Sequence, residues 1–331
     1  MAVSVETLDT PRVIHPGYPR VDRIFHGSAR TVAIVVLVVF GAIGLFLGLK
    51  SIATFHRYGT HFFSQADWNP ELNKIGISAT LLGTVEVAIV ALIVAFPLAL
   101  ATALFISEYA PARIKATLVA LVDLMAAVPS VIYGAWGFFL LMPSAKYVSR
   151  WLHQNLGFIP IFRVDTDPHA AIWAQSRYTG SMFIAGIVVS MMVLPIACAV
   201  MRGVFAQAPP GEREAAFALG ATKWGMIRSV VLPFGRGGII GGTMLGLGRA
   251  LGETVAVATV LFTAFEVKFR ILETGGNTIS KLIAERFGDA TTVQLAALLA
   301  AGFVLFLMTL MVNTLAAILI SRSRSGAATE I

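Results

Sequence analysis

Four ionisable side chains interrupt long apolar stretches of this 331-residue sequence: Glu86, Asp123, Arg249 and Glu253. A charge inside an apolar run is costly, about 2.5 to 3.5 kcal/mol on membrane-insertion scales, so such residues are functional candidates. The planar fork of donors of an Arg guanidinium suits bidentate contact with an oxyanion such as phosphate. Arg249 is therefore a candidate ligand for an anion.

The spacing of Arg249 and Glu253 predicts that the two side chains meet. Residues four apart lie on one face of a helix and can form an ion pair, although the order Glu before Arg is the better one. On this hypothesis Glu253 holds Arg249 when the site is empty, and closure of an outer gate turns Arg249 to the substrate. The alternative is a purely structural pair between packed helices.

The elements that must position these charges are membrane spans. The chain is 57% apolar and only 13% charged, about half the charged share of soluble domains. A span needs about 20 mostly apolar residues, and six stretches qualify: 31–49, 75–107, 118–142, 181–201, 237–265 and 293–320. Pro97, Pro129 and Pro195 should disturb three of these helices, and the glycines at 238, 242 and 246 should allow close packing.

Flanking segments predict the orientation. Residues 1–28 and 323–331 read as tails around a permease domain at 29–322, and the first apolar run is too long for a cleaved signal. Cytoplasmic termini place 13 Lys and Arg residues on the inner side and 11 in long outer loops at 50–74, 143–180 and 266–292. Basic residues close to span ends favour the inner side, so both termini are expected in the cytoplasm.

The loop at 207–236, between the fourth and fifth stretches, has the pattern of two short helices. From Pro209 it reads PPGEREAAFALGATKWGMIRSVVLP. Tandem prolines can start a helix and acidic residues suit its first turn. Ala215, Ala216 and Leu219 then share a small apolar face, and Gly220 supplies a left-handed helix end. A second helix is expected at 222–231, stopping before Pro233, so that the loop forms a rigid projection.

The loop resembles the EAA loop of permease subunits of ABC importers. The resemblance is carried by Glu214-Ala215-Ala216, Gly220 and Leu232-Pro233, and the one departure is Val230, where the family usually has Ile. It implies that Glu214, Ala215, Ala216, Leu219 and Gly220 form a coupling helix that docks on an ATPase subunit. The chain has no GxxxxGK[ST] phosphate loop, so the ATPase must be a separate chain.

Three further blocks, FISEYAP, LMAAVPSVIYGAWG and GLGRALGETVAV, resemble the phosphate permeases of the PstC type. The resemblance implies an all-α membrane protein with six transmembrane helices and type I importer (MetI-like) architecture in the bacterial cytoplasmic membrane. It implies a PstA-like permease, a PstB-like ATPase dimer and a PstS-like phosphate-binding protein as partners. Arg249, Glu253, Ser130 and Asp123 are then expected along the substrate path, although the family often has Glu in place of Asp123.

Alternatives remain open at this stage. Permeases for sulfate, molybdate or amino acids share the EAA loop, so the cargo is one open point. A secondary transporter could use Glu86 and Asp123 as proton or sodium sites, but this leaves the loop without a purpose. The sequence predicts no catalytic residue, cofactor or metal site, since the single Cys198 and the scattered histidines lack ligand spacing. Scattered basic residues give nucleic-acid binding no support.

Overall fold

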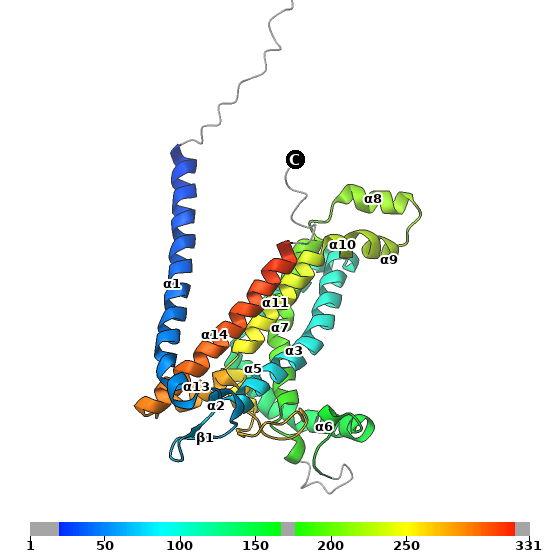
Figure 1. Ribbon diagram of the computed structural model, residues 1–331. Coiled ribbons are helices and arrows are strands. Elements are labelled where there is room, and N and C mark those ends of the chain that lie inside the picture. Colours follow the sequence, from blue (N-terminus) through cyan, green and yellow to red (C-terminus); the bar gives the residue numbers. More distant parts are fainter. Residues whose placement is uncertain (1–19, 167–175, 322–331) are drawn as a thin grey trace, which may run out of the picture. The chain divides into compact units, whose positions relative to one another are not determined.

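The computed structural model describes residues 20–166 and 176–321 (Figure 1). The chain forms two compact units, Met1–Phe46 and Leu47–Ile331, and each is described by itself. In the first unit the described part is helix α1 (Arg20–Tyr58), which continues into the second. The helix therefore begins before residue 31, where the first span was predicted to start. Residues 1–19 of the predicted N-terminal tail and the tail at 323–331 lie outside the described residues.

Long apolar helices confirm the all-α class. The predicted spans one, two, four and six correspond to α1, α3 (Ser78–Leu104), α7 (Met182–Phe205) and α14 (Thr292–Ser321). A π-helical turn at Phe105–Tyr109 extends α3. Two bent helix pairs also have the length and composition of a span, which gives six candidate spans if each pair crosses once. In the described residues the strands are β1 (Trp68–Asn69) and β2 (Lys74–Ile75), an antiparallel hairpin.

The predicted third span, 118–142, is bent at Pro129. Helix α4 (Ala112–Ala127) ends there, and the chain turns by 90° into α5 (Ser130–Trp136), the π-helical turn Gly137–Leu141 and α6 (Met142–Leu156). Val128 and Pro129 both have extended backbone angles, as expected because the ring of a proline disfavours helical geometry in the residue before it. The predicted disturbance at Pro129 is confirmed as a break between two helices, whereas Pro97 and Pro195 lie inside the continuous helices α3 and α7.

The prediction of one continuous helix over 237–265 is wrong. Helix α11 (Arg236–Gly252) stops at Gly252, a short helix α12 (Val255–Val260) follows, and the chain then runs irregularly to α13 (Ile279–Arg286). Two causes are visible. Gly252 is a poor helix former, and the Glu253 carboxylate accepts a hydrogen bond from the Ala256 backbone at 3.3 Å, which starts a new helix.

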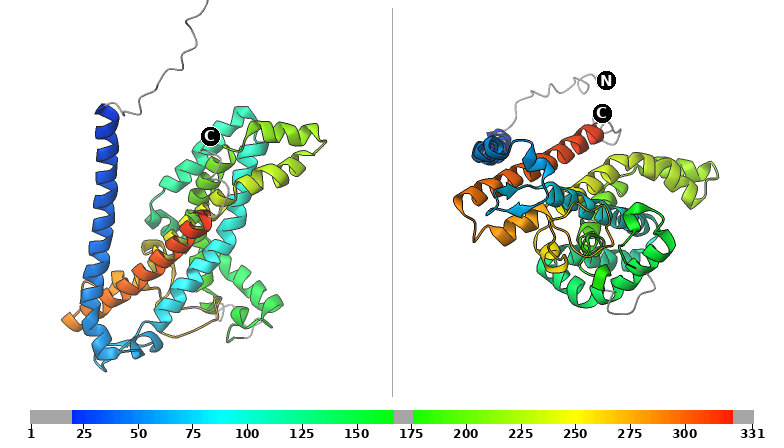
Figure 2. Two further views of the ribbon diagram at one scale, coloured as in Figure 1. Left: turned by 45° about the horizontal axis from the view of Figure 1, so that its top comes forward. Right: turned by 60° about the horizontal axis from the view of Figure 1, so that its bottom comes forward.

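The second unit is built around α7, which packs against α3 on one side and α11 on another. A Cβ added at Gly238, Gly242 or Gly246 would collide with α7, and one added at Gly186 would collide with Val90 of α3. Close packing of small residues, expected for the three glycines of α11, is thus confirmed. From this core α8 (Pro210–Ala218) and α9 (Lys223–Met226) project at one end, while α6 and α13 lie at the other (Figures 1 and 2).

Candidate substrate path and coupling loop

Two short helices meet beside the end of α11. Helix α5 begins after the break at Pro129, α12 begins after the break at Glu253, and the two pack directly on each other. A Cβ at Gly134 of α5 would lie only 3.0 Å from the Ala256 Cα of α12. Broken helices at the centre of a membrane protein expose helix ends and backbone groups where a cavity or path passes. The sequence-predicted residues Ser130, Arg249 and Glu253 all belong to this region.

Arg249 lies in the last turn of α11 with an exposed side chain. A cation suits this position because the carbonyl end of a helix carries partial negative charge. Its guanidinium is within electrostatic range of the Tyr133 phenol of α5, and that hydroxyl donates a hydrogen bond to the Met125 carbonyl at 2.8 Å. The ion pairs of the described residues do not include Arg249, so its donors remain available to a ligand.

Glu253 has a different place from the one predicted. It lies after the end of α11 in extended conformation, its side chain is buried, and its Oε1 faces the Ala256 amide. The prediction that Arg249 and Glu253 share one helix face is therefore wrong, because α11 ends at Gly252, before Glu253. Glu253 fixes the start of α12 instead.

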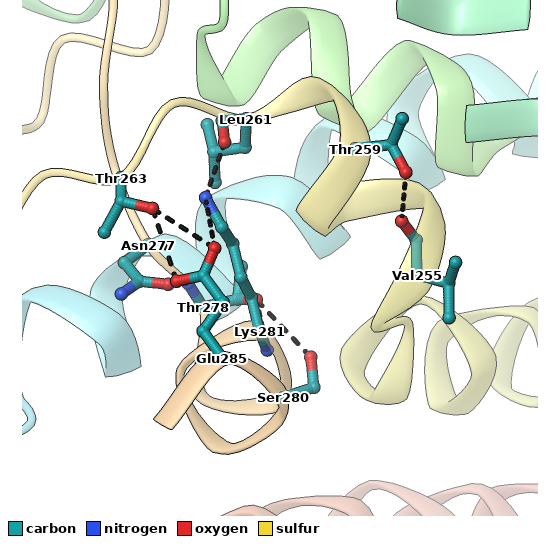
Figure 3. Close-up of polar contacts among 9 residues, drawn as sticks. All are labelled: Val255, Thr259, Leu261, Thr263, Asn277, Thr278, Ser280, Lys281 and Glu285. Carbon is teal, nitrogen blue, oxygen red and sulfur yellow. Dashed lines mark hydrogen bonds and ion pairs between the residues drawn. The ribbon is translucent and has the colours of Figure 1, made fainter. Parts of the chain in front are cut away.

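Helix α13 holds both ends of α12, a feature that the sequence did not reveal, and Figure 3 shows the contact at the Leu261 end. The Ser280 hydroxyl donates to the Glu253 carbonyl at 2.7 Å, and the Lys281 ammonium donates to the Leu261 carbonyl. Lys281 is 1% exposed and pairs with Glu285 at 3.6 Å, and Thr263 donates to the same carboxylate. Burial lowers the pKa of Lys281, while the Glu285 charge opposes that shift.

The other predicted path residues differ in their surroundings. Ser130 is half-buried at the start of α5. Asp123 of α4 pairs with Arg202 of α7 at 3.5 Å, a contact between two helices of the bundle. Glu86 is buried in α3, and the hydrogen bonds and ion pairs of the described residues assign it no partner.

The coupling loop has the predicted form. Helix α8 ends in a left-handed Gly220 with φ +84°. The Ala221 amide donates to the Ala216 carbonyl at 3.0 Å and the Gly220 amide to the Phe217 carbonyl at 2.9 Å, which is the Schellman helix end. The Thr222 hydroxyl then caps α9 by accepting from the Gly225 amide. The two-helix prediction and the role of Gly220 in it are confirmed. The predicted stop before Pro233 is wrong, because α9 continues through a π-helical turn (Ile227–Val231) into α10 (Leu232–Phe234), where Pro233 lies in the first turn and needs no helical hydrogen bond.

The tip of this loop is exposed. Leu219 is 89% exposed, and Glu214, Ala215 and Gly220 are exposed too, while Ala216 is half-buried. A projecting, well-capped helix end with an exposed leucine can be covered by another protein without rearrangement of the loop.

Two contacts join the coupling loop to the end of α3, and the sequence did not indicate either. Arg213 of α8 pairs with Glu108 at 3.2 Å and also donates to the Phe205 carbonyl at 2.6 Å. The Glu108 side chain is only 3% exposed. On the second helix, Lys223 lies 4.8 Å from the centroid of the Tyr109 ring. The loop is therefore in direct contact with the π-helical turn after α3.

Comparison with known proteins identifies the class. Residues 95–325 match the family described as "Binding-protein-dependent transport system inner membrane component", and the chain belongs to this family. It is thus the membrane component of a transport system and not the ATPase. A secondary transporter, the alternative that used Glu86 and Asp123, does not agree with this membership.

The particular relatives within the family are permeases of phosphate transport systems. The chain is 37% identical over 301 residues to "Phosphate transport system permease protein PstC 2" of Mycobacterium tuberculosis, covering 90% of this chain and 91% of the relative. It is 33% identical over 303 residues to PstC of Haemophilus influenzae, covering 91% and 94%. A bacterial ABC transporter structure for import of the acidic polysaccharide alginate aligns with TM-score 0.57 and 18% identity over 91% of this chain and 97% of that one, which supports the fold.

Proposed function

We propose that this chain is the PstC-type permease subunit of an ATP-driven phosphate importer and forms half of its membrane channel. The observation that carries the proposal is the likeness to PstC permeases along about 90% of both sequences. A PstA-like permease would complete the channel, a PstB-like ATPase dimer would bind the coupling loops, and a PstS-like protein would deliver phosphate from outside. Both termini would lie in the cytoplasm.

In this mechanism Arg249 is the phosphate ligand of this chain. Its side chain is exposed on the single subunit and stands at the meeting point of α5, α11 and α12. A guanidinium can contact two phosphate oxygens at once. The Glu253 carboxylate accepts a hydrogen bond from the Ala256 amide, so it does not hold Arg249 in the empty state. Its role in the mechanism is to position α12 beside the ligand.

The driving force would come from the coupling loop. Closure of the ATPase dimer draws the two permease loops together, and Arg213 passes the displacement of α8 to Glu108 at the end of α3. Since α3 packs along α7 and α11, the movement reaches the region of Arg249. Hydrolysis of ATP then resets the channel.

Uptake of labelled phosphate by cells that depend on this importer tests the proposal. We expect Arg249→Ala to abolish uptake and Arg249→Lys to reduce it at least tenfold, because an ammonium cannot make the bidentate contact. Arg286→Ala, at an exposed position of α13, is the control and should leave uptake unchanged. Normal uptake by Arg249→Ala would exclude this role. If competition assays show that the importer takes up sulfate, molybdate or an amino acid and not phosphate, the proposed cargo is wrong.

A further inference from the structure

Three cations surround one buried carboxylate, Glu273, in the loop between α12 and α13. The Glu273 side chain is 6% exposed and has three cations near it: Arg270 at 3.3 Å, Lys268 at 3.7 Å and Arg177 at 3.8 Å. Lys268 also pairs with Glu266 at 3.0 Å. Among the described groups that form these ion pairs, three cations and two carboxylates leave one net positive charge.

The contacts in this cluster are loose for a structural ion network. Buried carboxylates are normally satisfied by hydrogen bonds, yet within the described part of the chain the Oε2 atom of Glu273 is buried without one. The cations are in turn accessible: the side chains of Arg177, Arg270 and Lys268 are 51%, 37% and 21% exposed. Their donors are therefore not used up by Glu273.

The backbone of the cluster is fixed without these charges. The Thr274 amide donates to the Arg177 carbonyl at 2.7 Å, and the Gly275 amide donates to the Gly180 carbonyl at 3.1 Å. The Ile271 amide donates to the Ile161 carbonyl at 3.2 Å. Because main-chain bonds already hold the loop, a purely structural role does not explain why three cations converge on one point.

A small pocket opens beside the cluster. Lys268, Arg270 and Glu266 line it together with Glu86 of α3. Its volume is about 10 Å³, enough for roughly one water molecule, so a larger ligand would lie at its mouth, among the cations.

We infer that Arg177, Lys268 and Arg270 form a binding site for a phosphate-type oxyanion, and that Glu273 occupies the three cations when the site is empty. The loop lies at the end of the second unit opposite the coupling loop (Figure 1), so on the proposed function, on which the identity of the ligand rests, the site faces the outside. Inorganic phosphate on its way to Arg249 and the phosphate of a lipid head group share the required chemistry.

The distinguishing test uses Glu273→Gln. Removal of the competing carboxylate should tighten phosphate binding severalfold, because the cations stay while the negative charge disappears. The permease and ATPase complex is purified without the binding protein in a sugar detergent, and binding of labelled inorganic phosphate is measured by equilibrium dialysis. Unchanged or weaker phosphate binding by folded Glu273→Gln, together with lipid retention that does not depend on Arg177, would overturn the inference.

The complementary variants remove the cations. Arg177→Gln, the most exposed of the three, and the double variant Lys268→Gln/Arg270→Gln should weaken binding by tenfold or more, whereas Arg286→Gln, an exposed cation of α13, should not change it. If the double variant does not fold, Arg177→Gln still decides the question. An Arg249→Ala complex should still bind phosphate at the outer site. Loss of uptake by Arg249→Ala therefore tests the proposed function, and loss of phosphate binding by Arg177→Gln tests this inference.

A second measurement identifies the source of the oxyanion. Native mass spectrometry of the complex counts the phospholipids that remain bound in wild type and in Arg177→Gln. Retention that depends on Arg177 and resists inorganic phosphate assigns the site to a lipid head group, and displacement by phosphate assigns it to the free ion. If neither phosphate binding nor lipid retention depends on Arg177, the inference is wrong.

Discussion

At the scale of single residues, the role of Glu253 changes most between sequence and structure. The sequence suggested a charge partner for Arg249, while the structure shows an oxygen acceptor for the Ala256 amide. The two roles differ in what a neutral replacement does. An amide oxygen can accept the same hydrogen bond, but it cannot form an ion pair.

We therefore expect Glu253→Gln to keep the stability of the wild type and Glu253→Ala to lower the free energy of unfolding by about 1 kcal/mol, the usual loss of a helix cap. Thermal unfolding of the purified complex measures both. Thr254→Ala serves as the control, because the Thr254 hydroxyl bonds only to the nearby Gly252 carbonyl. Equal loss of stability in Glu253→Gln and Glu253→Ala would show that the charge itself is needed.

The positions of the charges were readable from the sequence because a charge in an apolar run stands out, and Arg249 is exposed as its chemistry requires. The break after Gly252 was not readable. Gly252 and Glu253 are local causes, but the partner that holds the Glu253 carbonyl after the break, Ser280, lies 27 residues further along. A local pattern of apolar residues contains no information about that partner, and the same holds for the buried Lys281.

At the scale of elements, the coupling loop was predictable because its signals are local. Tandem prolines, a glycine at the helix end and a Thr cap act within a few residues. The left-handed Gly220 gives a direct test, since any other residue at φ +84° is strained by about 1 to 2 kcal/mol.

Gly220→Ala should accordingly loosen the end of α8 and reduce recovery of the ATPase in a pull-down of the permease severalfold, with a matching loss of transport. Gly211→Ala in the same helix is the control, because an added Cβ there meets no atom within 4 Å and φ is not positive. If both variants recover the ATPase like the wild type, the loop is not the docking element.

The Arg213 and Glu108 pair links two elements and was missed because the residues lie 105 positions apart. Arg213→Gln leaves a carboxylate with a 3% exposed side chain unpaired, which typically costs about 3 to 5 kcal/mol. Glu108→Gln/Arg213→Gln should recover much of that stability in a thermal-unfolding cycle. Both variants should transport less phosphate per ATP hydrolysed, because the mechanical link is gone in each. A double variant with normal coupling would assign the pair to stability alone.

At the scale of the whole molecule, the two ends of the second unit have different chemistry. The coupling loop projects at one end, and α6 and α13 lie at the other (Figure 1). ATP is found in the cytoplasm, so a loop that binds an ATPase must face inward. The count of basic residues agrees in direction, but with 13 against 11 it decides little by itself.

Fusion reporters decide the orientation. Alkaline phosphatase joined after Gly157, which follows α6, should be active, because this enzyme folds only outside the cytoplasm where disulfides form. The same enzyme joined after Gly211, at the start of α8, should be inactive, and a fluorescent protein there should be bright. The reversed pattern would place the coupling loop outside, where no ATPase can reach it, and the proposed mechanism of ATP-driven import would then be untenable.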